Sequence, residues 1–244
     1  NLMKPRVMSL VLFTSMVGLL IAPEKVSFTV SIISLFAVAL GAGAAGALNM
    51  WYESDLDALM SRTCLRPIPT GRVQKNQALW FGIILSVISI SLLYFTANLV
   101  SSILLAITIG FYFFIYTIWL KRRTPQNIVV GGAAGALPPV IGWAIATNSI
   151  SAESIILFLI IFIWTPSHFW ALSLYKSSDY KKAKIPMLPI TSGIQTTKLN
   201  ILIYSLLMAP VVALPYFFNF GGLFYLMLSS LMTSYYVYLC AILF

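Results

Sequence analysis

The sequence predicts an all-α fold, a polytopic bundle of eight transmembrane helices. Of its 244 residues, 60% are hydrophobic and only 9% are charged, whereas a soluble domain carries roughly 25% charged residues. Apolar runs of about 20 residues recur along the chain, and each is long enough to cross a bilayer. A membrane β-barrel would instead show alternating segments of about 10 residues, and the sequence has no such pattern.

The expected spans follow one another with short connections and two longer ones. They cover residues 7–22, 28–50, 77–97, 99–120, 127–147, 153–173, 199–217 and 221–244. The two long connections are residues 51–76 and 174–198. No soluble domain interrupts the chain, so we expect a single transmembrane domain over residues 1–244. Because the chain opens on Asn1 and stops at Phe244 inside an apolar run, we also expect further residues at both ends, including a final span.

The basic residues support both the number of spans and their orientation. Fourteen of the fifteen lie on alternate connections, and Lys25 alone lies on the other side. They precede the first span (Lys4, Arg6) or follow the second (Arg62, Arg66, Arg72, Lys75), the fourth (Lys121, Arg122, Arg123) and the sixth (Lys176, Lys181, Lys182, Lys184, Lys198). Cytoplasmic loops carry an excess of Lys and Arg. The N-terminus and both long loops are therefore expected in the cytoplasm, and the net charge of +9 is assigned to orientation and not to nucleic-acid binding.

One glycine-rich stretch matches a nucleotide-binding pattern by coincidence. Residues 41–46 read GAGAAG, which fits G-x-G-x-x-G, but dinucleotide binding needs a preceding strand and a helix that opens on the glycines. Here the glycines lie inside an expected span. Small residues at such positions let helices approach closely, and we expect the same role for Gly131, Gly132 and Gly135.

Scarce acidic residues gather directly after the second span. Asn49, Glu53 and Asp57 are spaced i, i+4, i+8, so they share one helix face, and Asp55 points to the opposite side. An amide and two carboxylates are oxygen ligands of the kind that suits Mg²⁺. Two arginines, at positions 62 and 66, follow, and guanidinium groups bind phosphate oxygens. The alternative is a solvated loop whose charges pair with one another.

The second long loop carries one acid among several lysines. Asp179, opposite the first cluster, would complete a Mg²⁺ site, and Lys176 would contact a diphosphate. For most of the lysines in this loop we favour the alternative, a positively charged loop attracted to anionic lipid.

The motif from Asn49 to Pro67, N-x-x-x-E-x-D-x-D-x-x-M-x-R-T-x-x-R-P, resembles the first polar motif of the UbiA-type intramembrane prenyltransferases. More narrowly, three stretches are similar to the haem-farnesylating branch of that family, the haem O synthases. They are KPRV at 4–7, YTIWLKRRTPQNIVVGGAAGALPPVIGW at 116–143 and TPSHFWALSLYKSSDYKKAKIPMLP at 165–189. In two places the sequence departs from the family pattern: Glu53 replaces the usual aspartate, and the second loop has one acid where two are usual. The second loop therefore has fewer carboxylates for a second Mg²⁺ than the family pattern provides.

The resemblance implies nine helices in two bundle halves around a central cavity. It implies transfer of a farnesyl group from farnesyl diphosphate to the 2-vinyl group of haem b, which gives haem O and is assisted by Mg²⁺. Haem b would be a substrate and not a resident cofactor. The catalytic and metal-binding residues would be Asn49, Glu53, Asp57 and Asp179. The substrate-binding residues would be Arg62, Arg66, Lys121, Lys176, Asp55, Tyr116 and His168.

Two of these substrate contacts have a simple structural alternative. Tyr116 belongs to an aromatic group at the end of the fourth span, which is typical of an interfacial belt, although aromatic rings also shelter allylic cations. His168 is the only histidine. A lone histidine in an apolar helix is usually a packing residue, whereas a haem substrate would make axial ligation of the iron plausible.

Two other functions compete with haem farnesylation. One is a UbiA-type transferase that acts on a quinone precursor or another aromatic ring. The other is an ion-coupled transporter, which would place acids near mid-membrane. We expect an integral protein of a bacterial plasma membrane, with a mitochondrial inner membrane as the alternative. Expected partners are the two substrates, membrane lipid and no nucleic acid, with hand-over of the product to a haem A synthase or terminal oxidase.

Overall fold

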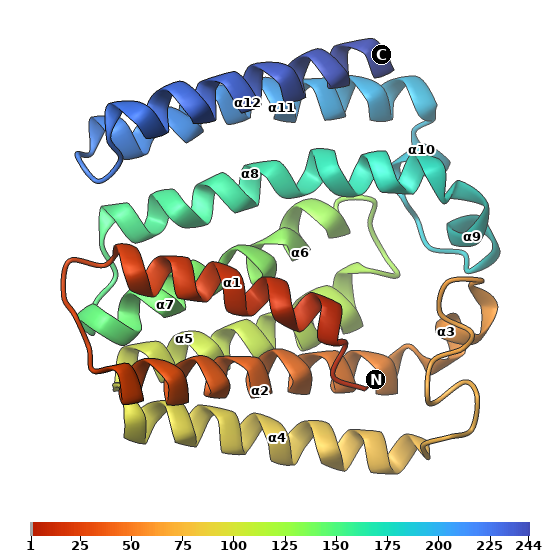
Figure 1. The fold of residues 1–244 in the computed structure, drawn as a ribbon. Coiled ribbons are helices and arrows are strands. Elements are labelled where there is room, and N and C mark those ends of the chain that lie inside the picture. The colour runs from red at the N-terminus through yellow and green to blue at the C-terminus, as the bar shows by residue number, and fades with distance from the viewer. Residues whose placement is uncertain (1) are drawn as a thin grey trace.

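The computed structural model describes residues 2–244, and their regular structure is helical (Figure 1). Within these residues, seven helical stretches are long and apolar enough to cross a membrane. They are α2 (Phe28–Tyr52), α4 (Lys75–Thr96), α5 (Leu99–Gly110) with η1 (Phe111–Leu120), α6 (Asn127–Ala136) with α7 (Pro138–Thr147), α8 (Ala152–Tyr175), α11 (Ile194–Phe217) and α12 (Leu223–Leu243). The first expected span is α1 (Pro5–Ile21), which is apolar but only 17 residues long. The all-α prediction is confirmed, and the count of eight is met by seven long stretches and this shorter helix.

Two of the spans are not single α-helices. The fourth changes at Phe111 from α-helix to a ten-residue π-helix, η1. The fifth is divided at Leu137, after which α7 begins with Pro138 and Pro139. Proline has no backbone N–H to donate and is tolerated in the first turn of a helix, so the pair ends α6 and starts α7 at the same point.

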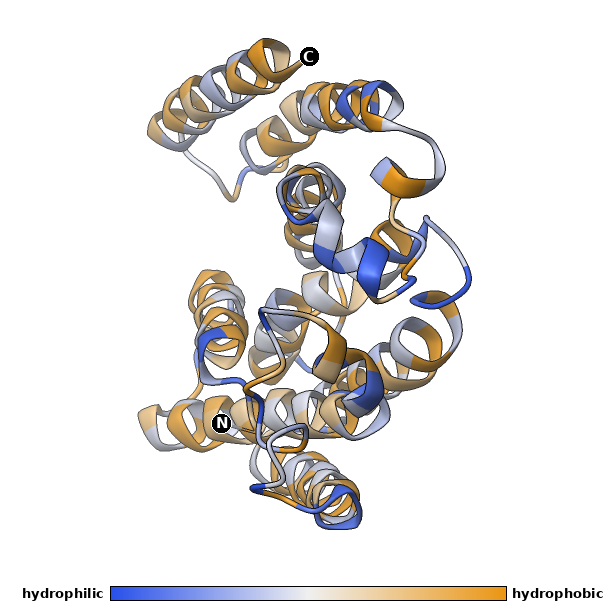
Figure 2. Ribbon diagram, turned by 90° about the vertical axis from the view of Figure 1, so that its right-hand side faces the viewer, coloured by the Kyte–Doolittle hydropathy of each residue, from blue (hydrophilic) through white to orange (hydrophobic). Residues whose placement is uncertain are grey.

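The two long loops lie at one end of the bundle. The first contains α3 (Ser54–Leu59), and the second contains α9 (Ser177–Lys182) and α10 (Leu188–Thr191). Figure 1 shows these short helices on the right, where the N-terminus also lies, and Figure 2 shows that hydrophilic segments gather at this end. The prediction that both loops and the N-terminus share one end is therefore confirmed, while the side of the membrane on which they lie stays a prediction.

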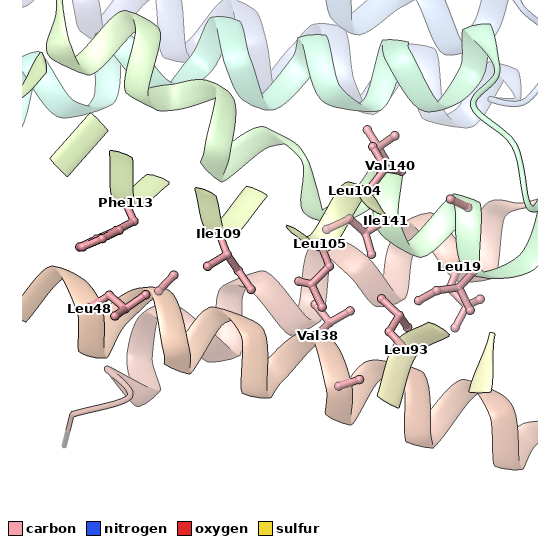
Figure 3. Close-up of a cluster of buried hydrophobic side chains, with 14 residues drawn as sticks. Leu19, Val38, Leu48, Leu93, Leu104, Leu105, Ile109, Phe113, Val140 and Ile141 are labelled. Atoms are coloured by element: carbon pink, nitrogen blue, oxygen red, sulfur yellow. The ribbon is translucent and has the colours of Figure 1, made fainter. Parts of the chain in front are cut away.

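Two hydrophobic clusters divide the bundle. The first joins α1, α2, α4, α5, η1 and α7 around residues such as Leu48, Leu105 and Ile141 (Figure 3). The second joins α3, α6, α8, α11 and α12 with the loop that contains α9 and α10, around Trp170 and Ile201. This division agrees with the two expected halves; the central cavity between them stays a prediction.

Small residues permit the close helix contacts, as expected. A Cβ added to Gly41 would lie 2.7 Å from Leu105, one added to Gly131 would lie 2.2 Å from Tyr116, and one added to Gly132 would lie 2.9 Å from Thr165. The GAGAAG stretch lies inside α2, and residues 2–40, which precede it, form no strand, so the nucleotide-binding alternative is wrong. Gly135 differs from its neighbours, because a Cβ there would meet nothing within 4 Å.

The tightest contact joins α1 to α7. A Cβ on Gly18 would lie 2.0 Å from the carbonyl oxygen of Pro139, and one on Gly142 would lie 1.9 Å from that of Ser15. The Ser15 hydroxyl also donates to the carbonyl of Pro138 at 2.9 Å. Each of these contacts is with backbone, which cannot rotate away as a side chain would, so this crossing depends on the two glycines.

Candidate active site

The candidate site begins where α2 passes into α3. Glu53 ends one helix and precedes the other, yet the hydrogen bonds from its N–H to the Asn49 carbonyl and from the Asp57 N–H to its own carbonyl keep the i→i−4 pattern, at 2.9 and 2.8 Å. The helical spacing therefore continues through the junction. Asn49, Glu53 and Asp57 are 2%, 1% and 3% exposed, whereas the side chain of Asp55 is 58% exposed. The structure thus buries the predicted face and leaves Asp55 on the other side.

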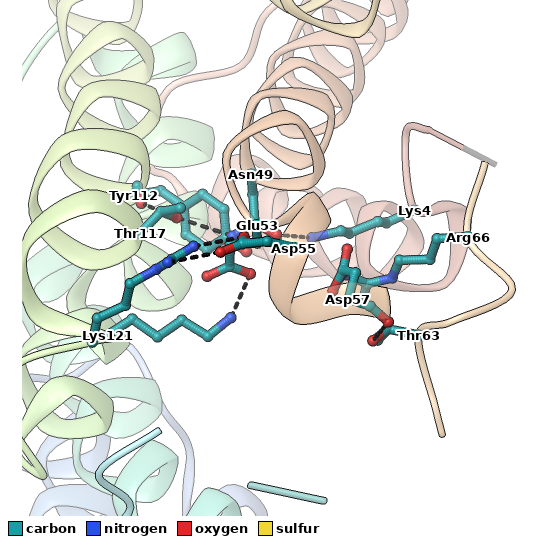
Figure 4. Close-up of polar contacts among 11 residues, drawn as sticks. Lys4, Asn49, Glu53, Asp55, Asp57, Thr63, Arg66, Tyr112, Thr117 and Lys121 are labelled. Carbon is teal, nitrogen blue, oxygen red and sulfur yellow. Dashed lines mark hydrogen bonds and ion pairs between the residues drawn. The ribbon is translucent and has the colours of Figure 1, made fainter. Parts of the chain in front are cut away.

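Each buried acid of this face is paired with a basic residue, Glu53 with Lys121 at the end of η1 and Asp57 with Arg66, nine positions on in the same loop (Figure 4). Lys121 Nζ lies 2.5 Å from Glu53 Oε2, and Arg66 Nη1 donates to both oxygens of Asp57 at 2.8 Å. Paired charges are the rule for buried ionic groups, because an unpaired charge is very costly to desolvate. One polar atom of this face remains without a partner among residues 2–244: Glu53 Oε1 is buried and has no hydrogen bond there.

The exposed acid on the other face forms a third ion pair. Two nitrogens of Arg122 donate to the two oxygens of Asp55, at 2.8 and 3.0 Å, and the guanidinium lies 5.1 Å from the Tyr52 ring centroid. Burial raises the pKa of Asp55, but the hydrogen bonds from Arg122 outweigh it and lower that pKa overall. This pair joins α3 to the connection after η1.

The second long loop reaches the first through Asp179. This carboxylate is buried and accepts a hydrogen bond from Ser61 at 2.6 Å. Tyr180 and Ile185 belong to the same hydrophobic cluster as Leu56, on α3. The two loops are therefore in contact, and the position of Asp179 opposite the acidic cluster stays a prediction.

Two predicted basic residues make no contact with these acids in the described residues. Lys176 Nζ lies 4.7 Å from the ring centroid of Tyr175, its own neighbour. Arg62 is exposed, and its side chain has neither a hydrogen bond nor an ion pair with any described residue. Their contact with a diphosphate stays a prediction.

The π-helix η1 forms the wall of the site opposite α2. The rings of Tyr112 and Tyr116 are 5.4 Å apart, and Lys121 Nζ lies 5.8 Å from the Tyr116 centroid. Thr117, which follows Tyr116 in the sequence, is fully buried. π-Helical turns occur frequently at functional sites, but the apolar run FYFFIYTIWL gave no sign of this one.

The sequence reasoning also missed Lys4. Its ammonium lies 2.5 Å from Asn49 Oδ1. Burial, followed by repulsion from Arg66, lowers the pKa of Lys4 to about 7. The only signal in the sequence is its place in the KPRV stretch. A lysine before the first span is explained by membrane orientation alone, so that signal does not point to the site.

His168 lies on α8 with an exposed side chain. Its ring stacks on Trp164 at 4.3 Å between centroids and 16° between planes, and it meets Phe169 edge-on at 5.4 Å. It forms no hydrogen bond or ion pair among the described residues. Ligation of haem iron by His168 stays a prediction.

The donor set fits a hard divalent cation, although the described residues hold no group of three or more His, Cys, Asp and Glu side chains that could bind a metal by themselves. The amide oxygen of Asn49 and the carboxylates of Glu53 and Asp57 are oxygen donors on one buried face, and Glu53 Oε1 lacks a partner among the residues described. Mg²⁺ is usually bound by one or two carboxylates together with substrate phosphates and water. Ammonium groups now lie against two of these residues, which shows that positive charge is accommodated there.

Comparison with known proteins yields a family, two curated relatives and a solved structure. The model of the UbiA prenyltransferase family matches residues 11–244. A protoheme IX farnesyltransferase of Pelagibacter ubique is 68% identical over 240 residues, which are 98% of this chain and 79% of that protein. One from Ehrlichia ruminantium is 58% identical over 215 residues, 88% and 73% of the two chains. Among solved structures, a UbiA homologue from Archaeoglobus fulgidus bound to DMAPP and Mg²⁺ matches with a TM-score of 0.77 at 17% identity, covering 99% of this chain and 85% of that one.

Proposed function

Because this chain belongs to the UbiA prenyltransferase family, we propose on that premise that it transfers the farnesyl group of farnesyl diphosphate to the 2-vinyl group of haem b, giving haem O. The observation that carries the proposal is the buried polar face of Asn49, Glu53 and Asp57, which meets Lys4, Lys121 and Arg66 at one end of a membrane bundle. Relatives up to 68% identical bear the name protoheme IX farnesyltransferase. This combination favours a haem acceptor over a quinone precursor.

The transfer requires heterolysis of the farnesyl C1–O bond, in which the electron pair leaves with the diphosphate. Mg²⁺, when bound, would neutralise charge on the diphosphate oxygens and so favour its departure. Asn49, Glu53 and Asp57 would hold the ion, with Asp179 contributing from the second loop. Lys121 and Arg66, each already beside a carboxylate of this face, would turn toward the diphosphate and stabilise the charge that develops there.

The allylic cation formed at C1 must survive until the acceptor attacks. The rings of Tyr112 and Tyr116 lie side by side on η1 next to Lys121, and aromatic faces attract cations. The terminal carbon of the 2-vinyl group then bonds to C1, and the cation moves to the vinyl carbon attached to the porphyrin. Water adds there and loses a proton, which gives the hydroxyethylfarnesyl group. Early water would hydrolyse the donor, and the contact between the two long loops would restrict its entry.

The transporter alternative is not favoured by the arrangement of acids. All the acidic residues lie at helix ends or in loops, whereas an ion relay needs acids within the membrane. The chain is an integral membrane protein. We place it in a bacterial plasma membrane with both long loops in the cytoplasm, supported by the distribution of Lys and Arg and by its bacterial relatives. Transfer of haem O to a haem A synthase or terminal oxidase completes the proposal.

The function is tested with the purified protein in detergent. Farnesyl diphosphate labelled at C1, haem b and Mg²⁺ are incubated together, and the porphyrins are analysed by mass spectrometry. We expect a haem product that carries the labelled farnesyl group and one added water, and none when EDTA replaces Mg²⁺. Prenylation of an aromatic acid in place of haem would assign the protein to the quinone-precursor alternative and refute the proposal.

A further inference from the structure

Thr117 connects the π-helix to the polar face of α2. Its side chain is fully buried, and its hydroxyl oxygen accepts a hydrogen bond from Asn49 Nδ2 at 3.0 Å. The same hydroxyl donates to the carbonyl oxygen of Tyr112 at 2.8 Å. One side chain thus ties Asn49 to the backbone of η1, although the two residues are 68 positions apart in the sequence.

The direction of the hydrogen bond that Thr117 donates to Tyr112 depends on the π-helical geometry. Thr108 and Thr165, in α-helical turns, donate to the carbonyl four residues earlier, whereas Thr117 donates to the carbonyl five residues earlier. The carbonyl of Tyr112 faces the Thr117 hydroxyl because η1 is wound as a π-helix at this point. The wider turn therefore decides where the only hydrogen of the hydroxyl goes.

That hydrogen determines how the amide of Asn49 is turned. Because the hydroxyl gives its hydrogen to Tyr112, it has only lone pairs to offer Asn49, so the NH₂ group must face Thr117. The amide oxygen then points the other way, where Lys4 Nζ lies 2.5 Å from it. If the amide were reversed, its oxygen would face the lone pairs of the Thr117 hydroxyl, and its NH₂ group would face the ammonium of Lys4. Both contacts therefore require the same orientation.

We propose that Thr117 is a positioning residue, which holds Asn49 with its amide oxygen toward the bound cation. An amide oxygen ligates a hard cation, and an amide NH₂ does not. The assignment deepens the proposed function and rests on it for the identity of the diphosphate substrate. Partners that orient a metal ligand typically change metal affinity 10- to 100-fold when they are removed.

The test measures cation binding without any prenyl donor or haem. Mn²⁺ is titrated into the purified protein in the presence of inorganic diphosphate, and free Mn²⁺ is followed by EPR. Thr117→Val keeps the shape and removes both hydrogen bonds, and we expect it to weaken Mn²⁺ binding at least 10-fold. Thr117→Ser should stay within about threefold of the parent protein. The matched control is Thr108→Val, which removes a hydroxyl from the same span without touching Asn49 and should bind Mn²⁺ normally.

A double mutant separates positioning from loss of structure. In an Asn49→Ala background, Thr117→Val should cause no further loss, because the residue through which it acts is absent. An equal loss in both backgrounds, or unchanged Mn²⁺ binding by folded Thr117→Val, would overturn the assignment. If Thr117→Val does not fold, Thr117→Cys, whose thiol is a weak hydrogen-bond partner, replaces it and should weaken binding at least about fivefold. Wild-type protein that binds Mn²⁺ and diphosphate but makes no haem O would refute the proposed function and leave this assignment standing.

Discussion

Replacing Glu53 by glutamine removes one charge from the candidate site with almost no change of shape. The glutamate is 1% exposed, one oxygen pairs with Lys121 at 2.5 Å, and the other has no partner in the part of the chain that the structure describes. At about 4 Å and an effective dielectric constant of about 20, one pair of unit charges interacts by about 4 kcal/mol. The glutamine oxygen still offers a dipole, so we expect a net loss of about 3 kcal/mol of transition-state stabilisation, or two orders of magnitude in rate.

The same substitution also lowers stability, and the two effects must be separated. Removing one partner of a buried ion pair costs about 3–5 kcal/mol. Lys121 keeps a side-chain exposure of 17%, so the loss should fall at the lower end of that range. Thermal unfolding in detergent measures this loss, and turnover is then measured at a temperature at which Glu53→Gln is folded, with saturating farnesyl diphosphate and a range of Mg²⁺ concentrations.

The control for Glu53→Gln is Glu153→Gln. Glu153 lies in the first turn of α8, and the 22 residues to Tyr175 place it about 33 Å along the helix from the loop end. It should leave both turnover and Mg²⁺ dependence unchanged. If folded Glu53→Gln retained more than about a fifth of wild-type turnover, where about one hundredth is expected, the view that this carboxylate helps to hold the cation would be refuted.

Three further predictions concern other parts of the molecule. Gly142→Ala should lower the unfolding temperature, because its Cβ would lie 1.9 Å from a backbone oxygen of α1. The control Gly135→Ala, in open space, should be neutral or slightly stabilising. Equal melting curves for the two variants would contradict the account of the α1–α7 crossing. Ser178→Cys, on an exposed position of α9, should react with an impermeant thiol reagent from the cytoplasmic side, and labelling only from the other side would reverse the topology. His168→Ala should weaken haem binding and remove an imidazole-type signature from the spectrum of bound haem, with the affinity for farnesyl diphosphate unchanged; an unaltered spectrum and affinity would rule out ligation.

The sequence predicted those features that depend on local periodicity. Apolar runs located the spans, and the spacing of Asn49, Glu53 and Asp57 predicted a shared face because hydrogen bonding continues through Glu53 into α3. The alternation of basic residues correctly placed both long loops at one end. Each of these inferences needs only neighbouring residues and the geometry of a helix.

Features that depend on distant contacts could not be predicted. How helices pack decides the partners of Glu53 and Asp55, the bond between Ser61 and Asp179 across 118 positions, and the contact of Lys4 with Asn49. Thr117 escaped notice because a threonine in an apolar run is normally satisfied by its own helix. Its hydrogen bond with Asn49 depends on the π-helical turn, which no residue pattern in η1 predicts.

Locating a bound metal tests the central claim most directly. Crystals or cryo-EM samples of the protein with Mn²⁺ and a non-hydrolysable farnesyl diphosphate analogue would show the ion. Anomalous X-ray scattering from the crystals would identify it. The account predicts Mn²⁺ about 2 Å from the amide oxygen of Asn49 and from carboxylate oxygens of Glu53 and Asp57, with Lys121 and Arg66 turned toward the diphosphate. Mn²⁺ and diphosphate bound elsewhere, with the pairs Glu53–Lys121 and Asp57–Arg66 still intact, would contradict it.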